Sequence, residues 1–470
     1  MIAHQELPVA IVGAGPIGLA AAAQLVRRGL QPLVLEQGAS VGSALRAWGH
    51  LRVFSPWRYV LEAASVDLLT MHGWEAPNPD ELPTGGEIVD RYLQPLAALP
   101  EIAPHIRAGC TVTAIGRLGM DKMTTPGRDT TPFQIRYVDG QGQEHSVLAG
   151  AVLDASGTWS RPNPLGTDGL PAIGETGAAG RIAYGLPDIL GAEREHYVGR
   201  SVLVVGSGHS AINVVLALMA LRRISPETRV LWALRRNRIE RLLGGGLNDQ
   251  LPARGSLGLA AQEAIAAGDV ELLAPFAVQA IRQDGSRLQV HALHDGRPDQ
   301  RAVDRIVVAT GFRPDLDMLR EVRLDLDPAV EAPRLLAPMI DPNLHSCGSV
   351  PPHGVVELAQ PEPGFFIVGS KSYGRAPTFL MATGYEQVRS VVAELAGDHD
   401  AARQVHLVLP ETGVCSATPS SQISASCCGG PAPAGTDACC KADLEAKQEG
   451  KPGCGCSDAV PHRSQMEPAE

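Results

Sequence analysis

Aromatic side chains are scarce in this sequence of 470 residues, in which Phe, Trp and Tyr together make up 4%. Basic residues are too few to balance the acidic ones, and the net charge of −11 disfavours general binding to nucleic acids or anionic membranes. Before residue 411 the only cysteines are Cys110 and Cys347, which excludes a redox dithiol of CxxC or CxxxxC spacing there. Glycine and proline are abundant, at 51 and 37 residues, so we expect a loop-rich α/β protein of two or three domains.

A long uninterrupted hydrophobic run is missing as well. The apolar stretch 9–26 contains three glycines and a proline, and their spacing fits a strand and a helix better than a membrane span. No basic segment precedes this stretch and no small-residue cleavage signal follows it, so it does not resemble a secretory signal peptide. We therefore expect a cytoplasmic protein.

The sequence does contain a glycine-rich turn, 13–18, between an apolar strand, 9–12, and an alanine-rich helix, 19–28. In such a turn one glycine permits the bend, one lets the backbone approach a pyrophosphate, and one lets helix and strand pack closely. The free amides of the helix N-terminus then face the phosphate charge. The next strand, 33–35, ends at an acid that can accept hydrogen bonds from ribose hydroxyls. The predicted dinucleotide-binding residues are Gly13, Gly15, Pro16, Gly18 and Glu36.

A second copy of this pattern begins with the strand 201–205 and continues through the turn 206–211 into the helix 212–221. Its second strand, 229–234, is followed by two arginines instead of an acid. Guanidinium groups there suit a ribose 2′-phosphate and favour NADP over NAD, although they could also be solvated surface residues. The predicted NADPH-binding residues are Gly206, Ser207, Gly208, His209, Ser210, Arg235 and Arg236.

Between the two patterns, the segment 48–58 concentrates aromatic residues and arginines. Flat rings and positive charge suit an isoalloxazine ring and its oxygen chemistry, and a packed aromatic crossing is the equally weighted alternative. We predict that Trp57 contacts the flavin. Arg52 and Arg58 are the candidate catalytic residues, which would stabilise negative charge in the oxygen reaction.

Two apolar strands with glycine turns, 151–157 and 305–314, bracket the second pattern. This order predicts an α/β fold of two Rossmann-like dinucleotide-binding domains, the second inserted in the first. We expect an FAD domain over 1–160 and 305–400, an NADPH domain over 161–304, and a linker and tail over 401–470. Further cofactor contacts are predicted at Thr310, Gly311, Gly369 and Thr383, the last at a helix N-terminus that could stabilise a reduced flavin.

Seven of the nine cysteines lie after residue 411, in a segment rich in Gly, Pro, Ala and Ser that we expect to be disordered without a ligand. Adjacent cysteines disfavour a structural disulfide, and thiolates select soft ions such as Cu(I), Zn(II) or trivalent arsenic. Zinc-finger spacing is missing, which favours an adaptable trap for a soft metal, with a dispensable thiol-rich tail as the alternative. The predicted ligands are Cys427, Cys428, Cys439, Cys440, Cys454 and Cys456.

Both glycine patterns and the Ala-Thr-Gly-Phe-Arg-Pro turn at 309–314 resemble the two-dinucleotide-binding flavoproteins, and their pairing resembles flavin-containing monooxygenases. The segments 48–58, 184–188 and 205–213, with the cysteine-rich end, are similar to flavin-binding monooxygenases associated with arsenic-resistance gene clusters. The resemblance covers about residues 5–400 and implies FAD, NADPH, O2 and a small-molecule substrate.

The sequence departs from this resemblance at two places. The FxGxxxH signature of flavin-containing monooxygenases has no counterpart histidine in 182–188. Ser370 stands where related reductases often have an acid that meets the flavin ribityl chain.

Three functions follow from these features. The first is an NADPH-dependent FAD monooxygenase that oxidises a soft nucleophile, such as trivalent arsenic or an organoarsenical, in metalloid resistance. The second is an NADPH-dependent flavin reductase that passes electrons to the tail thiols or to a metal or metalloid bound by them. The third is a flavin-bearing protein that binds soft metals with little turnover.

Overall fold

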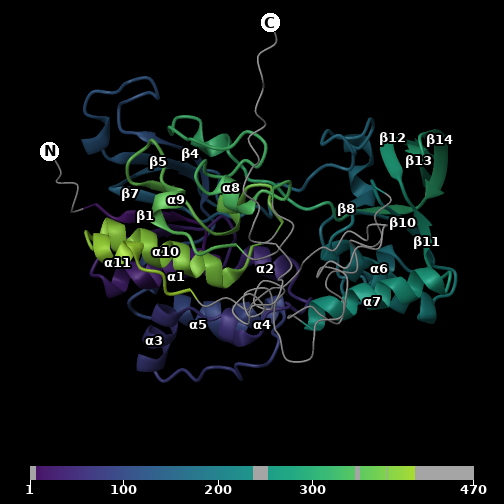
Figure 1. The fold of residues 1–470 in the computed structure, drawn as a ribbon, viewed down its shortest axis with the longest axis horizontal. Coiled ribbons are helices and arrows are strands. Elements are labelled where there is room, and N and C mark those ends of the chain that lie inside the picture. Colours follow the sequence, from purple (N-terminus) through teal and green to yellow (C-terminus); the bar gives the residue numbers. More distant parts are fainter. Residues whose placement is uncertain (1–6, 237–251, 345–349, 378, 408–470) are drawn as a thin grey trace, which may run out of the picture.

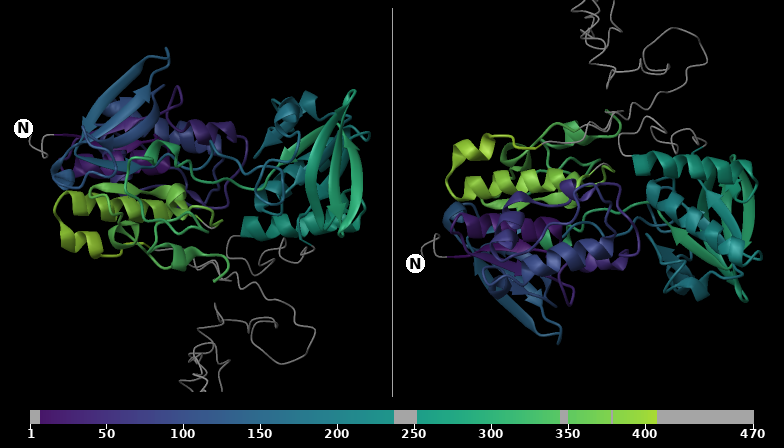
Figure 2. Two further views of the ribbon diagram at one scale, coloured as in Figure 1. Left: turned by 90° about the horizontal axis from the view of Figure 1, so that it is seen from above. Right: turned by 90° about the horizontal axis from the view of Figure 1, so that it is seen from below.

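The computed structural model describes residues 7–236, 252–344, 350–377 and 379–407 (Figure 1). These residues form two α/β units, each with a five-stranded parallel sheet and a smaller three-stranded sheet. Figure 2 shows the units side by side, with the purple, blue and yellow-green segments in one and the teal segments in the other. The predicted fold class is confirmed for the described residues, and the cysteine-rich tail lies outside them.

The parallel sheet of the first unit places the strand that precedes the first glycine turn at its centre. Its order is β16 (Phe365–Ile367), β7 (Ala151–Asp154), β1 (Val9–Val12), β2 (Pro32–Leu35) and β3 (Ile106–Arg107). Every residue of the four strands from β16 to β2 is buried, as expected for parallel strands whose two faces are both covered.

Helix α1 (Pro16–Arg27) is central to the core of this unit, where it packs against α10 (Met381–Leu395) and α3 (Ala63–Met71). Its alanines 20–23 are completely buried and let the neighbouring elements approach closely. The other helices of the unit are α2 (Ser43–Ala47), α4 (Gly85–Ile88), α5 (Gln94–Ala97), α8 (Ala337–Ile340), α9 (Val355–Leu358) and α11 (His399–Arg403).

An antiparallel sheet of β4 (Thr111–Arg117), β5 (Phe133–Val138) and β6 (Glu144–Ala149) extends the first unit. A buried ionic cluster joins it to the segment before β16: the Glu362 carboxylate accepts from Arg117 Nε at 2.8 Å and from Arg128 Nη2 at 2.7 Å. Burial opposes ionisation of Glu362, but the two guanidinium groups outweigh it and hold its pKa below the usual range.

The second unit has the sheet order β11 (Glu271–Leu273), β10 (Arg229–Ala233), β9 (Ser201–Val205), β15 (Arg305–Val308) and β8 (Ile182–Tyr184). Helices α6 (His209–Ile224) and α7 (Pro252–Ala266) lie together beside this sheet (Figure 1). The smaller sheet of this unit contains β12 (Phe276–Asp284), β13 (Arg287–His294) and β14 (Arg297–Val303).

Strand β15 belongs to the second unit, which differs from the domain boundary predicted between residues 304 and 305. It pairs in parallel with β9 and β8, so the chain returns to the first unit only after Val308. A short apolar run fits the interior of either parallel sheet, and only its partner strands decide to which sheet it belongs.

Candidate functional site

The first glycine turn, residues 13–18, joins β1 to α1 and leaves open space at one glycine only. Gly13 has φ +100°, and a Cβ there would lie 2.8 Å from the Ala155 carbonyl oxygen, while a Cβ on Gly18 would lie 1.9 Å from the Gly13 oxygen. No atom lies within 4 Å of the Cβ position of Gly15, the residue that precedes α1. Pro16 is the first residue of the helix. This arrangement fits a pyrophosphate over Gly15, facing the free amides of α1.

Glu36 follows β2 and is buried beside this turn. Its Oε2 accepts from the backbone amide of Ala14 at 2.7 Å, and its Oε1 accepts from the Gly38 amide and the Ser43 hydroxyl, each at 2.7 Å. A carboxylate has about four acceptor positions, so these three bonds fix its orientation and leave capacity for a ribose hydroxyl. The ribose contact of Glu36 stays a prediction.

The second glycine turn, residues 206–211, repeats the geometry of the first. Gly206 has φ +141°, and a Cβ there would lie 2.3 Å from the Ala309 carbonyl oxygen. Gly208, which precedes α6, has no atom within 4 Å of its Cβ position, and Ala211 is completely buried against the core of the unit. The second unit therefore offers the same open helix N-terminus for a second dinucleotide.

The predicted NADPH residues line this turn. Ser207 and Gly208 are exposed, and His209 and Ser210 are half-buried in the first turn of α6. Arg235 and Arg236 follow β10, both exposed, and Arg235 Nη1 donates to the Thr167 carbonyl at 3.2 Å. Their position at the strand end fits a 2′-phosphate, and their role stays a prediction. The segment after Arg236 lies outside the described residues.

The aromatic segment 48–58 of the first unit reaches the second glycine turn. The ring of Phe54 meets the ring of His209 edge-on, with centroids 5.3 Å apart. The predicted site residues of this segment take other positions. Trp57 is a buried side chain of the core with Arg91 5.7 Å from its ring, and its flavin contact stays a prediction.

The two arginines proposed as catalytic are exposed and paired within the first unit. Arg52 donates to the Leu82 carbonyl and lies 4.0 Å from a Glu87 carboxylate oxygen, whereas Arg58 forms an ion pair with Asp80. Hydrogen bonds from the Thr84 amide and hydroxyl, together with Arg52, hold the pKa of Glu87 below its usual range. A flavin contact of Arg52 or Arg58 stays a prediction.

The two connections between the units run side by side, with Pro162 and Phe312 paired in an antiparallel bridge. Thr310 and Gly311 lie in the second connection and are exposed, and Asn163 Nδ2 donates to the Thr310 carbonyl at 3.0 Å. The Trp159 ring lies 4.7 Å from the Phe312 ring. Both predicted residues thus stand where the chain passes from one dinucleotide unit to the other.

Gly369 belongs to a buried network beside the first turns of α10 that the sequence did not predict. The Gly369 amide donates to Gln387 Oε1 at 2.7 Å, and Gln387 Nε2 lies 2.8 Å from Ser372 Oγ and 2.9 Å from His353 Nε2. Thr383 is buried in the first turn of the same helix. A glutamine inside an amphipathic helix was the only signal in the sequence. The network fixes the backbone turn at Gly369.

His353 in this network has a defined tautomer. Its Nδ1 lies 3.0 Å from the Pro351 carbonyl oxygen, which can only accept, so Nδ1 carries the hydrogen and Nε2 accepts from Gln387. Burial lowers the pKa of His353 below its usual value. The neutral imidazole therefore satisfies both of its partners.

A second feature missed from the sequence is a buried Lys371–Asp154 ion pair between the glycine turns after β16 and β7. Lys371 is not part of a recognisable sequence motif. A lysine just after a buried apolar strand only weakly indicates that it is buried and paired with an acid. The adjoining Gly157 Cβ position lies 3.5 Å from Ser370 Oγ, so the two turns are in contact. The two turns therefore pack together at the carboxyl ends of the neighbouring strands β7 and β16.

The predicted soft-metal ligands, with Cys415 and Cys347, lie outside the described residues. Cys110 is buried, and burial raises the pKa of its thiol. Across the described ranges, no three His, Cys, Asp or Glu side chains gather in a group that could hold a metal ion. None of the helices described in those ranges is both long and apolar enough to span a membrane.

Residues 10–125 match a protein family described as pyridine nucleotide-disulphide oxidoreductase. The ferredoxin–NADP reductase of Granulibacter bethesdensis is 26% identical over 68% of this chain and 75% of its own. The indole-3-pyruvate monooxygenase YUCCA1 of Oryza sativa subsp. japonica is 30% identical over 44% of each chain.

Solved structures show the same fold. The bacillithiol disulfide reductase of Bacillus cereus is 18% identical, with a TM-score of 0.60 over 83% of this chain and 99% of its own. The ornithine N-hydroxylase of Kutzneria sp. 744 is 15% identical, with a TM-score of 0.56 over 84% of this chain and 99% of its own. The enzyme class comes from the family match and the sequence relatives: together with the two glycine turns, they show an enzyme of the flavin-dependent oxidoreductase class.

Proposed function

We propose that this chain is an NADPH-dependent FAD monooxygenase that oxidises a soft nucleophile, trivalent arsenic or an organoarsenical, in metalloid resistance. Its cofactors are FAD and NADPH. The paired geometry of Gly15 and Gly208, each open in front of a helix N-terminus in its own unit, carries the proposal, because it provides two dinucleotide sites in one chain. A cytoplasmic location is part of the proposal, since thiols there stay reduced.

The reaction balances with NADPH as the reductant and O2 as the oxidant. NADPH and a proton supply two electrons, one oxygen atom goes to the substrate, and the other leaves as water. The bound flavin supplies the hydride and oxygen chemistry. The protein holds both cofactors by their phosphates, through the Gly15 turn and α1 in one unit and the Gly208 turn and α6 in the other. Arg235 and Arg236 would select the 2′-phosphate.

Two observations support oxygenation over thiol chemistry. Within the described residues the body of the protein has a single cysteine, Cys110, which is buried and not part of a dithiol. Relatives named for oxygenation, an indole-3-pyruvate monooxygenase and an ornithine N-hydroxylase, share sequence or fold with it. Arsenic is proposed as the substrate because the tail contains the six predicted cysteine ligands. Thiolates are preferred ligands of soft ions.

The decisive experiment measures O2 uptake, NADPH oxidation and arsenic speciation together, with arsenite or methylarsenite as substrate. We expect equimolar consumption of NADPH, O2 and substrate, with one atom from ¹⁸O2 in the arsenic product. Removal of residues 411–470 should raise the apparent KM for the metalloid while sparing NADPH oxidation. Substrate turnover under anaerobic conditions would exclude the monooxygenase.

A second candidate function is an NADPH-dependent flavin reductase that passes electrons to the tail thiols or to a metal or metalloid bound by them. The likeness to a ferredoxin–NADP reductase over 68% of the chain favours it, as does the shared fold with a disulfide reductase. In this case NADPH would be consumed without O2. Replacement of Cys439 and Cys440 by serine would then stop electron transfer.

A further inference from the structure

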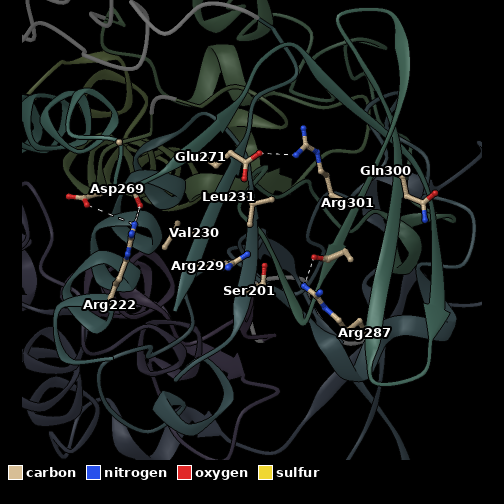
Figure 3. A pocket seen from close by; sticks show the side chains of 12 residues that line it. Ser201, Arg222, Arg229, Val230, Leu231, Asp269, Glu271, Arg287, Gln300 and Arg301 are labelled. Atoms are coloured by element: carbon tan, nitrogen blue, oxygen red, sulfur yellow. Dashed lines mark hydrogen bonds and ion pairs between the residues drawn. The ribbon is translucent and has the colours of Figure 1, made fainter. Parts of the chain in front are cut away.

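A pocket of about 530 Å³ opens on the second unit, away from the second glycine turn (Figure 3). Ser201 and Arg229, the first residues of β9 and β10, lie in its wall, whereas the glycine turn follows the last residue of β9. The pocket therefore occupies the amino-terminal edge of the parallel sheet. Dinucleotides bind such sheets at the carboxyl-terminal edge, so the pocket is separate from the predicted NADPH site.

Four arginines from four elements converge on this pocket, namely Arg222 of α6, Arg229 of β10, Arg287 of β13 and Arg301 of β14. Figure 3 shows their side chains around one opening, with Arg229 between Arg222 and Arg287. The elements are one helix, one strand of the parallel sheet and two strands of the smaller antiparallel sheet. Guanidinium groups gathered at one opening favour the binding of an anion there.

The carboxylates at the pocket satisfy these arginines unequally. Arg301 is well paired, since Nη1 lies 2.8 Å from Glu271 Oε1 and Nη2 lies 3.0 Å from Asp299 Oδ2. Arg222 is 3.9 Å from Asp269 Oδ1, and Arg287 is 3.6 Å from Asp304 Oδ1. Both of these distances exceed those of charge-assisted hydrogen bonds, which are about 2.7–2.9 Å.

Arg229 is the exception among the four. Its guanidinium has neither an ion pair nor a hydrogen bond to any residue in the described part of the chain, and no dashed line reaches it in Figure 3. An arginine offers five N–H donors in a planar fork. The pocket thus contains one exposed, unpaired fork. It is flanked by Arg222, which donates to the Asp269 carbonyl, and by Arg287, whose Nη2 donates to the Ala302 carbonyl at 2.6 Å.

We propose that this pocket binds a small molecule through a phosphate group, with Arg229 as the main anchor. Arg222 and Arg287 each use one nitrogen for a backbone carbonyl and keep other N–H donors for the same group, and the Ser201 hydroxyl and Gln300 amide offer further donors. A phosphate fits this set because its oxygens point in several directions and can accept from forks on different elements.

The test is isothermal titration of the full-length FAD-loaded protein with inorganic pyrophosphate and with AMP, at saturating NADP⁺ so that the second glycine turn is occupied. We expect binding that weakens as salt is raised. Arg229→Gln should weaken it about tenfold or more. Arg320→Gln is the matched control, because Arg320 is 81% exposed, lies in the first unit, and should leave binding unchanged.

A gain-of-affinity variant separates binding from a merely structural effect. Asp269→Asn removes the carboxylate nearest Arg222 and should tighten pyrophosphate binding about two- to fivefold. Binding of pyrophosphate alone assigns an inorganic ligand, whereas tighter binding of AMP assigns an organic phosphate. The proposal is overturned if neither probe binds, if Arg229→Gln binds as the unaltered protein does, or if citrate binds as tightly as pyrophosphate.

Discussion

Lys371 Nζ lies 2.6 Å from Asp154 Oδ2, and both side chains are completely shielded from solvent. Ser156 completes the arrangement: its hydroxyl donates to Asp154 Oδ1 at 2.6 Å and accepts from Lys371 Nζ at 3.0 Å. Asp154 ends β7, and Lys371 lies in the 3-10 helix Gly369–Tyr373 after β16. The pair therefore locks together two turns that surround the first glycine turn.

The two turns joined by this ion pair also contact the first glycine turn. The Ala155 carbonyl, next to Asp154, is the atom against which Gly13 packs, and the Cβ position of Gly369 lies 3.1 Å from an Ile17 side-chain carbon. A shift of either outer turn would move the backbone around Gly15. The buried charges thus contribute to the shape of the predicted FAD site.

Removal of one partner of this ion pair should destabilise the protein strongly. Lys371→Met leaves Asp154 buried without a counter-charge, which costs about 3–5 kcal/mol, whereas the double variant Asp154→Leu/Lys371→Met should recover most of that loss. Urea unfolding followed by fluorescence measures both. Lys122→Met, at an exposed lysine, is the control that should change little. A single variant as stable as the control would contradict a buried pair.

Alanine at the open glycines should separate cofactor binding from folding. Gly15 and Gly208 have φ of −79° and −93°, which alanine adopts freely, and no atom lies near either Cβ position. Gly15→Ala should therefore fold but retain less FAD, and Gly208→Ala should retain FAD but raise KM for NADPH about tenfold. The flavin absorbance of the purified protein and steady-state kinetics measure the two effects.

Gly177→Ala is the control for these variants, because Gly177 also has open space at its Cβ position and lies outside both glycine turns. It should leave FAD content and KM unchanged. Equal losses in all three variants would indicate a general effect of alanine rather than phosphate binding.

The choice between NADPH and NADH should depend on the arginines after β10. Replacement of both Arg235 and Arg236 by alanine removes the forks for the 2′-phosphate, so kcat/KM for NADPH should fall by about ten- to a hundredfold while that for NADH changes little. Parallel rates with the two coenzymes measure the preference. If the ratio of kcat/KM for NADPH to kcat/KM for NADH is unchanged, these arginines are solvated surface residues without a role in coenzyme choice.

His353 should make stability depend on pH. Burial lowers its pKa below the ordinary 6.5, so the folded protein keeps the ring neutral while the unfolded chain takes up a proton. The contribution of the neutral His353 ring to the free energy of unfolding is complete above pH 6.5. It is lost as pH falls from 6.5 through the pKa of His353 in the folded protein. Melting temperatures between pH 8 and pH 5 should therefore fall less in His353→Gln than in the unaltered protein. His196→Gln, at an exposed ring, should follow the unaltered protein.

The hydrophobic periodicity of the sequence predicted the strand, the glycine turn and the helix of both dinucleotide sites. Both glycine turns lie between the predicted strands and helices because a short apolar run, a glycine turn and an apolar helix are local features. The open positions at Gly15 and Gly208 agree with the spacing of the pattern. Strand β15 was assigned to the wrong unit because its partners are distant in the sequence.

By itself, the sequence determined that there are two dinucleotide units and that an acid follows one while arginines follow the other, since these depend on neighbouring residues. Only the tertiary structure decided which charges meet. Lys371 and Asp154 are separated by 217 residues, and the arginines of the pocket lie on four different elements. Such contacts are made when strands pair and helices pack, and no local pattern specifies them.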